Sequence, residues 1–112
     1  IYCGWAQILD GEGGTPKSPT PGKVHKAVTS IGWNPYFDNK EKTVEPHIMH
    51  TFDEDFYGCR LKLLVVARLR DEKNFDSMEA LIEAIQQDIR DTDECLNGEE
   101  FKLLAAHDHF KL

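Results

Sequence analysis

One carboxylate stands in the middle of a β-prone segment. Residues 43–52 read TVEPHIMHTF, and Glu45 lies directly before Pro46, whose ring limits backbone motion. A carboxylate on such a rigid element can take a proton from a reacting hydroxyl group. The alternative is a solvated strand glutamate with no chemical role. The residues alone leave both interpretations open.

Two histidines follow on the same segment. His47 and His50 have the H-x-x-H spacing of some metal sites, but residues three apart on a strand face opposite sides. No third ligand is near them, so we expect His47 to be a packing histidine. The acidic run at 53–55 offers the oxygen ligands that Mg²⁺ prefers, but a solvated turn is the simpler interpretation. We therefore predict no metal ligand in this chain.

Composition and charge restrict the partners. The chain has 112 residues, which fits one domain over 1–112. Its net charge is −7, from 13 basic and 20 acidic residues, which argues against a nucleic acid or an anionic membrane as partner. A phosphate site would therefore have to be local. The longest apolar run, at 63–67, is far shorter than the ~20 residues of a membrane helix.

The cysteines and the start of the chain indicate the compartment. Cys3, Cys59 and Cys95 form no C-x-x-C pair, which suggests unpaired thiols in a reducing compartment. No signal peptide is visible, so we expect a cytoplasmic protein. The first residue is Ile1, inside a strand-like pattern, and we expect the chain to begin within a domain.

Alternation and turn residues predict a β-rich α+β domain. Strands are expected over residues 1–9, 23–31, 43–52 and 59–70. Glycines and prolines in 10–22 predict a flexible surface loop, and Pro46 predicts a bulge or an edge strand. A helix is expected over 76–90, with Asp76 as N-cap, and a second short helix over 99–106.

Hydrophobic periodicity predicts which side chains are buried. In 59–70 the alternation places one set of apolar residues on a single face of the strand. That set is Leu61, Leu63, Val65, Ala67 and Leu69. Leu64 and Val66 fall on the other face, so the centre of the strand is expected to be covered on both sides. In the helix, an apolar stripe at helical spacing is expected to face the core. It consists of Met78, Leu81, Ile82, Ile85 and Ile89.

Four ordered motifs then resemble those of the eukaryotic riboflavin kinases. They are Ile31–Tyr36 (IGWNPY), Glu45–Phe52 (EPHIMHTF), Asp55–Gly58 (DFYG) and Arg70–Ser77 (RDEKNFDS). The resemblance covers residues 1–90. It implies a six-stranded antiparallel β-barrel with a C-terminal helix, of which the N-terminal strands are missing from this chain. It also implies transfer of the γ-phosphate of ATP to the ribityl 5′-hydroxyl of riboflavin, giving FMN, with a divalent cation (Mg²⁺, Mn²⁺ or Zn²⁺).

The resemblance also implies roles for individual residues. Glu45 matches the family's catalytic glutamate, and Ile48, His50 and Tyr57 match positions that line its nucleotide site. A flavin ring needs an aromatic or apolar wall and polar groups at its edge. Phe75 can supply the wall, and Arg70 and Asn74 the edge contacts, although a basic loop with a buried phenylalanine is the alternative.

Two family motifs do not occur in these 112 residues. In the family, a G-x-G-R-G loop and a P-T-A-N motif hold the phosphates and the cation, and both precede the strand that matches 1–9. We therefore expect the chain as given to lack part of the active site. Two alternatives remain: a barrel that binds flavin without catalysis, and one half of a bifunctional flavin enzyme. We expect a monomer.

Overall fold

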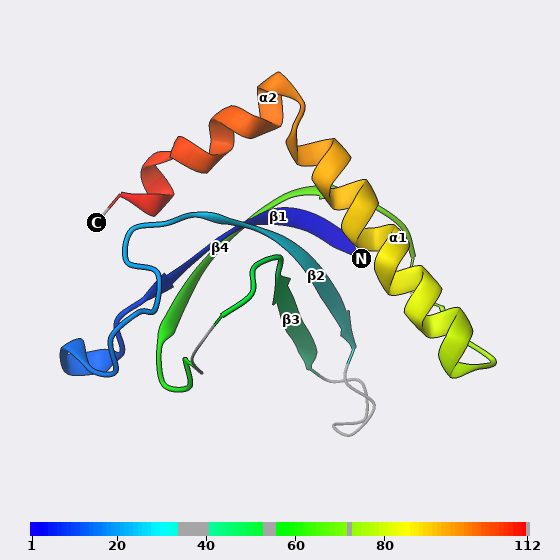
Figure 1. Ribbon diagram of the computed structural model, residues 1–112, viewed down its shortest axis with the longest axis horizontal. Helices are drawn as coiled ribbons and strands as arrows, with labels where there is room; N and C mark the ends of the chain where they lie inside the picture. Colours follow the sequence, from blue (N-terminus) through cyan, green and yellow to red (C-terminus); the bar gives the residue numbers. More distant parts are fainter. Residues whose placement is uncertain (34–40, 53–55, 72, 112) are drawn as a thin grey trace.

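In this computed structural model the chain folds into a curved antiparallel sheet, and helices arch over one face of that sheet (Figure 1). The structure describes residues 1–33, 41–52, 56–71 and 73–111. The strands are β1 (Tyr2–Leu9), β2 (His25–Trp33), β3 (Lys42–Ile48) and β4 (Arg60–Arg68). The helices are α1 (Met78–Leu96) and α2 (Glu99–Lys102), with 3₁₀ turns η1 (Glu12–Gly14), η3 (Leu103–Ala106) and η4 (Asp108–Phe110).

The four strands lie in the order β3-β2-β1-β4, and each neighbouring pair is antiparallel. The predicted mainly β class with a C-terminal helix is therefore confirmed. The described strands form an open four-stranded sheet with β3 and β4 at its edges, and the six-stranded barrel that the resemblance implies stays a prediction. The expected edge position for Pro46, on β3, is also confirmed.

The pleat gives the sheet two faces with separate apolar clusters. One face lies under the helices, and we call it the helix-covered face. There Cys3 and Trp5 of β1 pack with Leu96 and Phe110, and the Trp5 indole donates to the Phe101 carbonyl at 3.0 Å. On the opposite face, a second cluster is built from Ala6, Ile8, Ala27 and Ile48.

A β-bulge in β4 changes which side chains share a face. Gly4 pairs with Val65 but Cys3 pairs with Ala67, so Val66 is an extra residue. A Cβ on Gly4 would lie 2.2 Å from the Leu64 carbonyl oxygen, so the bulge requires glycine there.

The predicted grouping of these five residues on one face was therefore wrong, whereas the predicted cover on both sides of the strand centre is confirmed: Leu63 packs on the opposite-face cluster and Leu64 on the helix-covered one. Leu64 and Val66 pack on the same cluster as Ala67 and Leu69, because the bulge shifts the alternation by one residue.

Helix α1 is longer than the predicted 76–90, and its N-cap is Ser77 rather than Asp76. The Ser77 hydroxyl accepts a hydrogen bond from the Ala80 amide at 3.1 Å. The helix continues to Leu96 because the first stop signal is Asn97–Gly98. Within the described residues, no helix combines the length and apolarity needed to cross a membrane.

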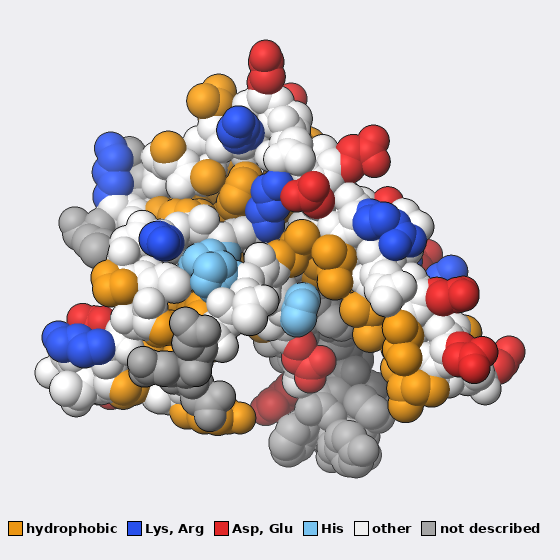
Figure 2. All heavy atoms as spheres, in the orientation of Figure 1, with side chains coloured by type: hydrophobic (Ala, Val, Ile, Leu, Met, Phe, Trp, Pro, Cys, Tyr) orange, Lys and Arg blue, Asp and Glu red, His pale blue; other side chains and the backbone are white. Residues whose placement is uncertain are grey.

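The apolar stripe of α1 is not the core face that we expected. Met78, Ile82 and Ile85 are 69%, 46% and 45% exposed, whereas Thr92 and Leu96 are fully buried. Only the second half of the helix packs on the sheet, and the first half extends past β2 (Figure 1). In Figure 2, hydrophobic side chains follow the side of α1 that is turned toward the sheet.

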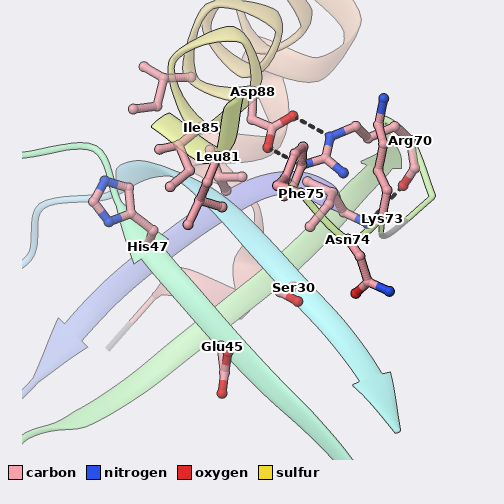
Figure 3. Close-up of a pocket in the computed structure, with 13 residues that line it drawn as sticks. Ser30, Glu45, His47, Arg70, Lys73, Asn74, Phe75, Leu81, Ile85 and Asp88 are labelled. Carbon is pink, nitrogen blue, oxygen red and sulfur yellow. Dashed lines mark hydrogen bonds and ion pairs between the residues drawn. The ribbon is translucent and has the colours of Figure 1, made fainter. Parts of the chain in front are cut away.

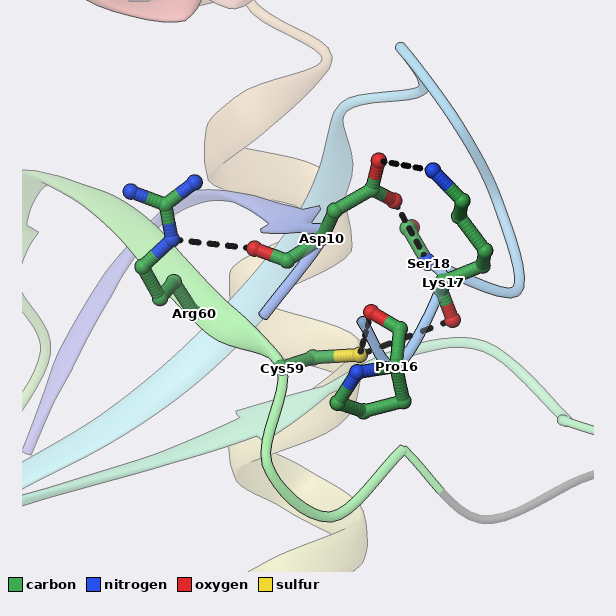
Figure 4. Close-up of polar contacts among 6 residues, drawn as sticks. All are labelled: Asp10, Pro16, Lys17, Ser18, Cys59 and Arg60. Atoms are coloured by element: carbon green, nitrogen blue, oxygen red, sulfur yellow. Dashed lines mark hydrogen bonds and ion pairs between the residues drawn. The ribbon is translucent and has the colours of Figure 1, made fainter. Parts of the chain in front are cut away.

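The connection at 10–22, predicted to be a flexible surface loop, is held by several polar contacts (Figure 4). The Asp10 carboxylate accepts a hydrogen bond from the Ser18 amide at 2.8 Å, and this bond holds its pKa below the usual value. Arg60 of β4 donates from Nε to the Asp10 carbonyl at 2.9 Å. The flexibility of this loop stays a prediction.

Two of the free thiols lie side by side. The sulfur atoms of Cys3 and Cys95 are 3.4 Å apart, and they join β1 to the end of α1. Burial, and then the contact with the Cys95 thiol, raises the pKa of Cys3 to about 12. Sequence spacing could not show this proximity, because the two residues are 92 positions apart.

Candidate active site

A cavity of about 560 Å³ lies between the first half of α1, the segment 70–75 and the helix-covered face of β2 and β3 (Figure 3). This volume is typical of small-molecule sites, which are largely apolar with a few polar groups. The cavity is built from three walls.

The first wall is the pair of strands β2 and β3. Glu45 pairs with Ser30 and His47 pairs with Val28, and the strand alternation turns all four side chains to this cavity. Glu45 and His47 are both exposed. The expectation that His47 packs in the interior was therefore wrong: it lies two residues from Glu45, on the same face.

The second wall is the segment that follows β4. Arg70, Lys73, Asn74 and Phe75 all line the cavity. The Arg70 guanidinium lies over the Phe75 ring, with Cζ 5.8 Å from the ring centroid. All three residues that we associated with a flavin therefore share one cavity with Glu45.

The third wall is the first half of α1. Leu81, Ile85 and Ile89 supply apolar surface, and Asp88 reaches back to Arg70 (Figure 3). Our sequence interpretation assigned these apolar residues to the core and missed Asp88. The sequence did contain a signal for Asp88. Positions 81, 85 and 88 share one side of a helix, and an aspartate at the third of them interrupts the apolar pattern.

The three residues associated with a nucleotide lie elsewhere. Ile48 is buried in the cluster on the opposite face of the sheet. The His50 ring contacts His25 in a tilted arrangement and Phe52 edge-on, with ring centroids 4.7 Å apart in both pairs. Tyr57 is 88% exposed and lines a second cavity of about 450 Å³.

A buried histidine, His25, packs against the His50 ring. His25 is 8% exposed, and its Nε2 lies 2.9 Å from the Thr20 hydroxyl. Burial, followed by the nearby His50 and Lys23, lowers the pKa of His25 below 6.5. His25 is therefore a neutral packing partner for the His50 ring near neutral pH.

No group of three or more histidine, cysteine, aspartate or glutamate side chains that could hold a metal ion occurs among the described residues. The acidic run at 53–55, considered above as a possible turn or magnesium site, lies outside the described residues, as does Tyr36. We therefore assign none of the described residues to a cation.

The fold and the cavity together define a class: a mainly β domain with a helix-covered antiparallel sheet and a cavity of small-molecule size that contains one exposed carboxylate. The sequence model of the riboflavin kinase family (Flavokinase) matches residues 1–96. This chain belongs to the riboflavin kinase family.

Relatives and a solved structure agree with this assignment. Human riboflavin kinase is 46% identical over 112 residues, which cover 100% of this chain and 65% of that protein. A bifunctional riboflavin kinase/FMN phosphatase of Arabidopsis thaliana is 48% identical over 88 residues, covering 79% of this chain and 20% of that protein. The crystal structure of riboflavin kinase from Trypanosoma brucei superposes with a TM-score of 0.82 at 28% identity, covering 100% of this chain and 66% of that one.

The chain thus spans 65% of the length of the human and mouse riboflavin kinases that it matches.

Proposed function

We propose that the protein containing this chain phosphorylates riboflavin, with ATP as the phosphate donor, and releases FMN and ADP. The observation that carries the proposal is the single cavity in which an exposed carboxylate, Glu45, faces an apolar and aromatic wall. Leu81, Ile85 and Phe75 offer the surface that a flat flavin ring would cover, and Arg70 and Asn74 lie beside it.

In this reaction Glu45 acts as general base. Its carboxylate takes the proton of the ribityl 5′-hydroxyl while that oxygen bonds to the γ-phosphorus, and the bond from this phosphorus to the β,γ-bridging oxygen breaks. The strand position suits this role, because pairing with Ser30 fixes the backbone of Glu45.

The nucleotide would lie on the face of the sheet opposite the helices, where Ile48 of β3 is buried, near His50 and Tyr57 in the segment that follows β3. The His50 and Phe52 rings meet edge-on, with centroids 4.7 Å apart, and His50 is exposed, so its ring is an aromatic group that a purine base could contact. The cation that accompanies ATP is Mg²⁺ in this proposal, and the described residues contain no cluster of three or more histidine, cysteine, aspartate or glutamate side chains that could hold it. We further propose that the protein is a cytoplasmic monomer.

The test is Glu45→Gln in the full-length protein. A lost general base lowers turnover by about 10²- to 10⁴-fold. We expect riboflavin binding, followed by flavin fluorescence, to stay near the wild-type level while FMN formation, followed by chromatography, falls. Glu41→Gln is the matched control, because Glu41 is an exposed glutamate just before β3 that does not line the cavity.

The outcomes distinguish the role of Glu45 from the choice between an enzyme and a binding module. Wild-type turnover in Glu45→Gln would remove the assigned role from this carboxylate. A wild-type protein that binds riboflavin but forms no FMN would instead identify a binding module.

A further inference from the structure

Asp88 is the buried carboxylate among the residues that the structure describes. It is 5% exposed and lies on α1, at the junction with the cavity. A carboxylate removed from water is stable only when its oxygens are paired and hydrogen-bonded. Its partner therefore decides what Asp88 does.

That partner is Arg70, which forms a bidentate ion pair with Asp88. Arg70 Nε donates to Asp88 Oδ1 at 2.8 Å, and Nη2 donates to Oδ2 at 2.8 Å (Figure 3). Two parallel, charge-assisted bonds fix the guanidinium in position and in orientation. The exposed fractions of the two side chains, 23% for Arg70 and 7% for Asp88, mean that water screens the pair only in part.

The ion pair links α1 to the segment 70–75. Arg70 also donates from Nη1 to the Asp71 carbonyl at 2.8 Å, and its guanidinium lies over the Phe75 ring. Asp88 thus fixes Arg70, and Arg70 fixes both ends of the segment that forms one cavity wall. Several donors of Arg70 point to the protein rather than to the cavity.

We propose that Asp88 is a positioning residue for flavin binding: its ion pair with Arg70 holds Phe75 and Asn74 in place as the wall against which the flavin ring packs. This inference rests on the proposed function. It assigns to Arg70 an effect on flavin affinity through the position of Phe75.

The test compares Asp88→Asn with a matched control in the full-length protein. The amide keeps the shape of the carboxylate but loses the charge and one acceptor. We expect the riboflavin KM to rise about tenfold, equivalent to ~1.4 kcal/mol. The ATP KM should stay within about twofold, because Asp88 lies on the helix-covered face of the sheet and the nucleotide is proposed on the opposite face. Hydrogen exchange of the 71–76 amides should accelerate, because the ion pair no longer holds this segment.

The control is Asp93→Asn. Asp93 lies on the same helix and also joins it to the sheet, through Lys26 at 2.5 Å, but it does not line the cavity. This variant tests whether a loosened helix is enough. It should leave the riboflavin KM and the exchange of 71–76 unchanged.

A second variant covers a failure of Asp88→Asn to fold. Arg70→Lys keeps the positive charge but cannot form the bidentate pair with Asp88. It should also raise the riboflavin KM about tenfold. An unchanged riboflavin KM in a folded Asp88→Asn, or an equal rise in Asp93→Asn, would overturn the inference. Wild-type protein that neither binds nor phosphorylates riboflavin would overturn the proposed function and this inference with it.

Discussion

Two isoleucines on α1 allow a direct test of the cavity. Ile82 and Ile85 are 46% and 45% exposed, but only Ile85 lines the cavity. Replacement by alanine removes three carbon groups from each, worth about 2.4 kcal/mol when fully buried, at ~0.8 kcal/mol per group. The pair therefore matches in residue type, in exposure and in helix, and differs in contact with the ligand.

The exposed fraction divides this free energy between folding and binding. Slightly more than half of each side chain is covered in the folded chain, so both variants should lose about 1.3 kcal/mol of stability. A flavin that covers the rest of Ile85 would gain about 1 kcal/mol from it, so Ile85→Ala should weaken riboflavin binding roughly sixfold. Ile82→Ala should bind as wild type.

The assay is a fluorescence titration of riboflavin, with a urea denaturation curve for each variant. Leu96→Ala provides the reference for a true core position, because Leu96 is fully buried and its loss should cost roughly 3–5 kcal/mol. Equal riboflavin affinity in Ile85→Ala and Ile82→Ala would show that the apolar side of α1 is not a ligand wall.

Two further predictions concern the sheet. Gly4→Val should destabilise the fold by about 3 kcal/mol or more in urea denaturation, since a Cβ there would lie 2.2 Å from the Leu64 carbonyl oxygen; a loss under about 1 kcal/mol would mean that the bulge relaxes freely. The lowered pKa of His25 means that the unfolded chain binds the proton more readily than the folded one, so stability should be full above pH 6.5 and fall as the pH drops toward the folded pKa. His25→Gln should flatten that part of the stability profile, and an unchanged slope would assign it to other groups.

The sequence predicted where the strands and helices lie better than it predicted which of their side chains are buried. Alternation and turn residues identified all four strands, because those signals are local. The bulge at Gly4 depends on how closely two strands approach, and no pattern within residues 59–70 contains that information. A helix was expected where α1 lies, but its N-cap and its end were wrong, and its first half lines a cavity while its second half packs on the core.

The candidate site divides in the same way. Glu45 and the segment 70–75 were found from motif resemblance, and the structure brings them into one cavity. Asp88 was missed because its importance comes from a partner 18 positions away. His47 was assigned to packing although its spacing of two from Glu45 on a strand predicts a shared face.

The alternation along β3 has a consequence for changing this protein's chemistry. Glu45 and His47 face the helices, while Ile48 belongs to the opposite face. One face of β3 thus lines the cavity, and the other face belongs to the cluster that contains Ile48. His47, which lines the cavity beside Glu45, is therefore a position where the shape of the cavity can be redesigned without a change to the cluster that contains Ile48.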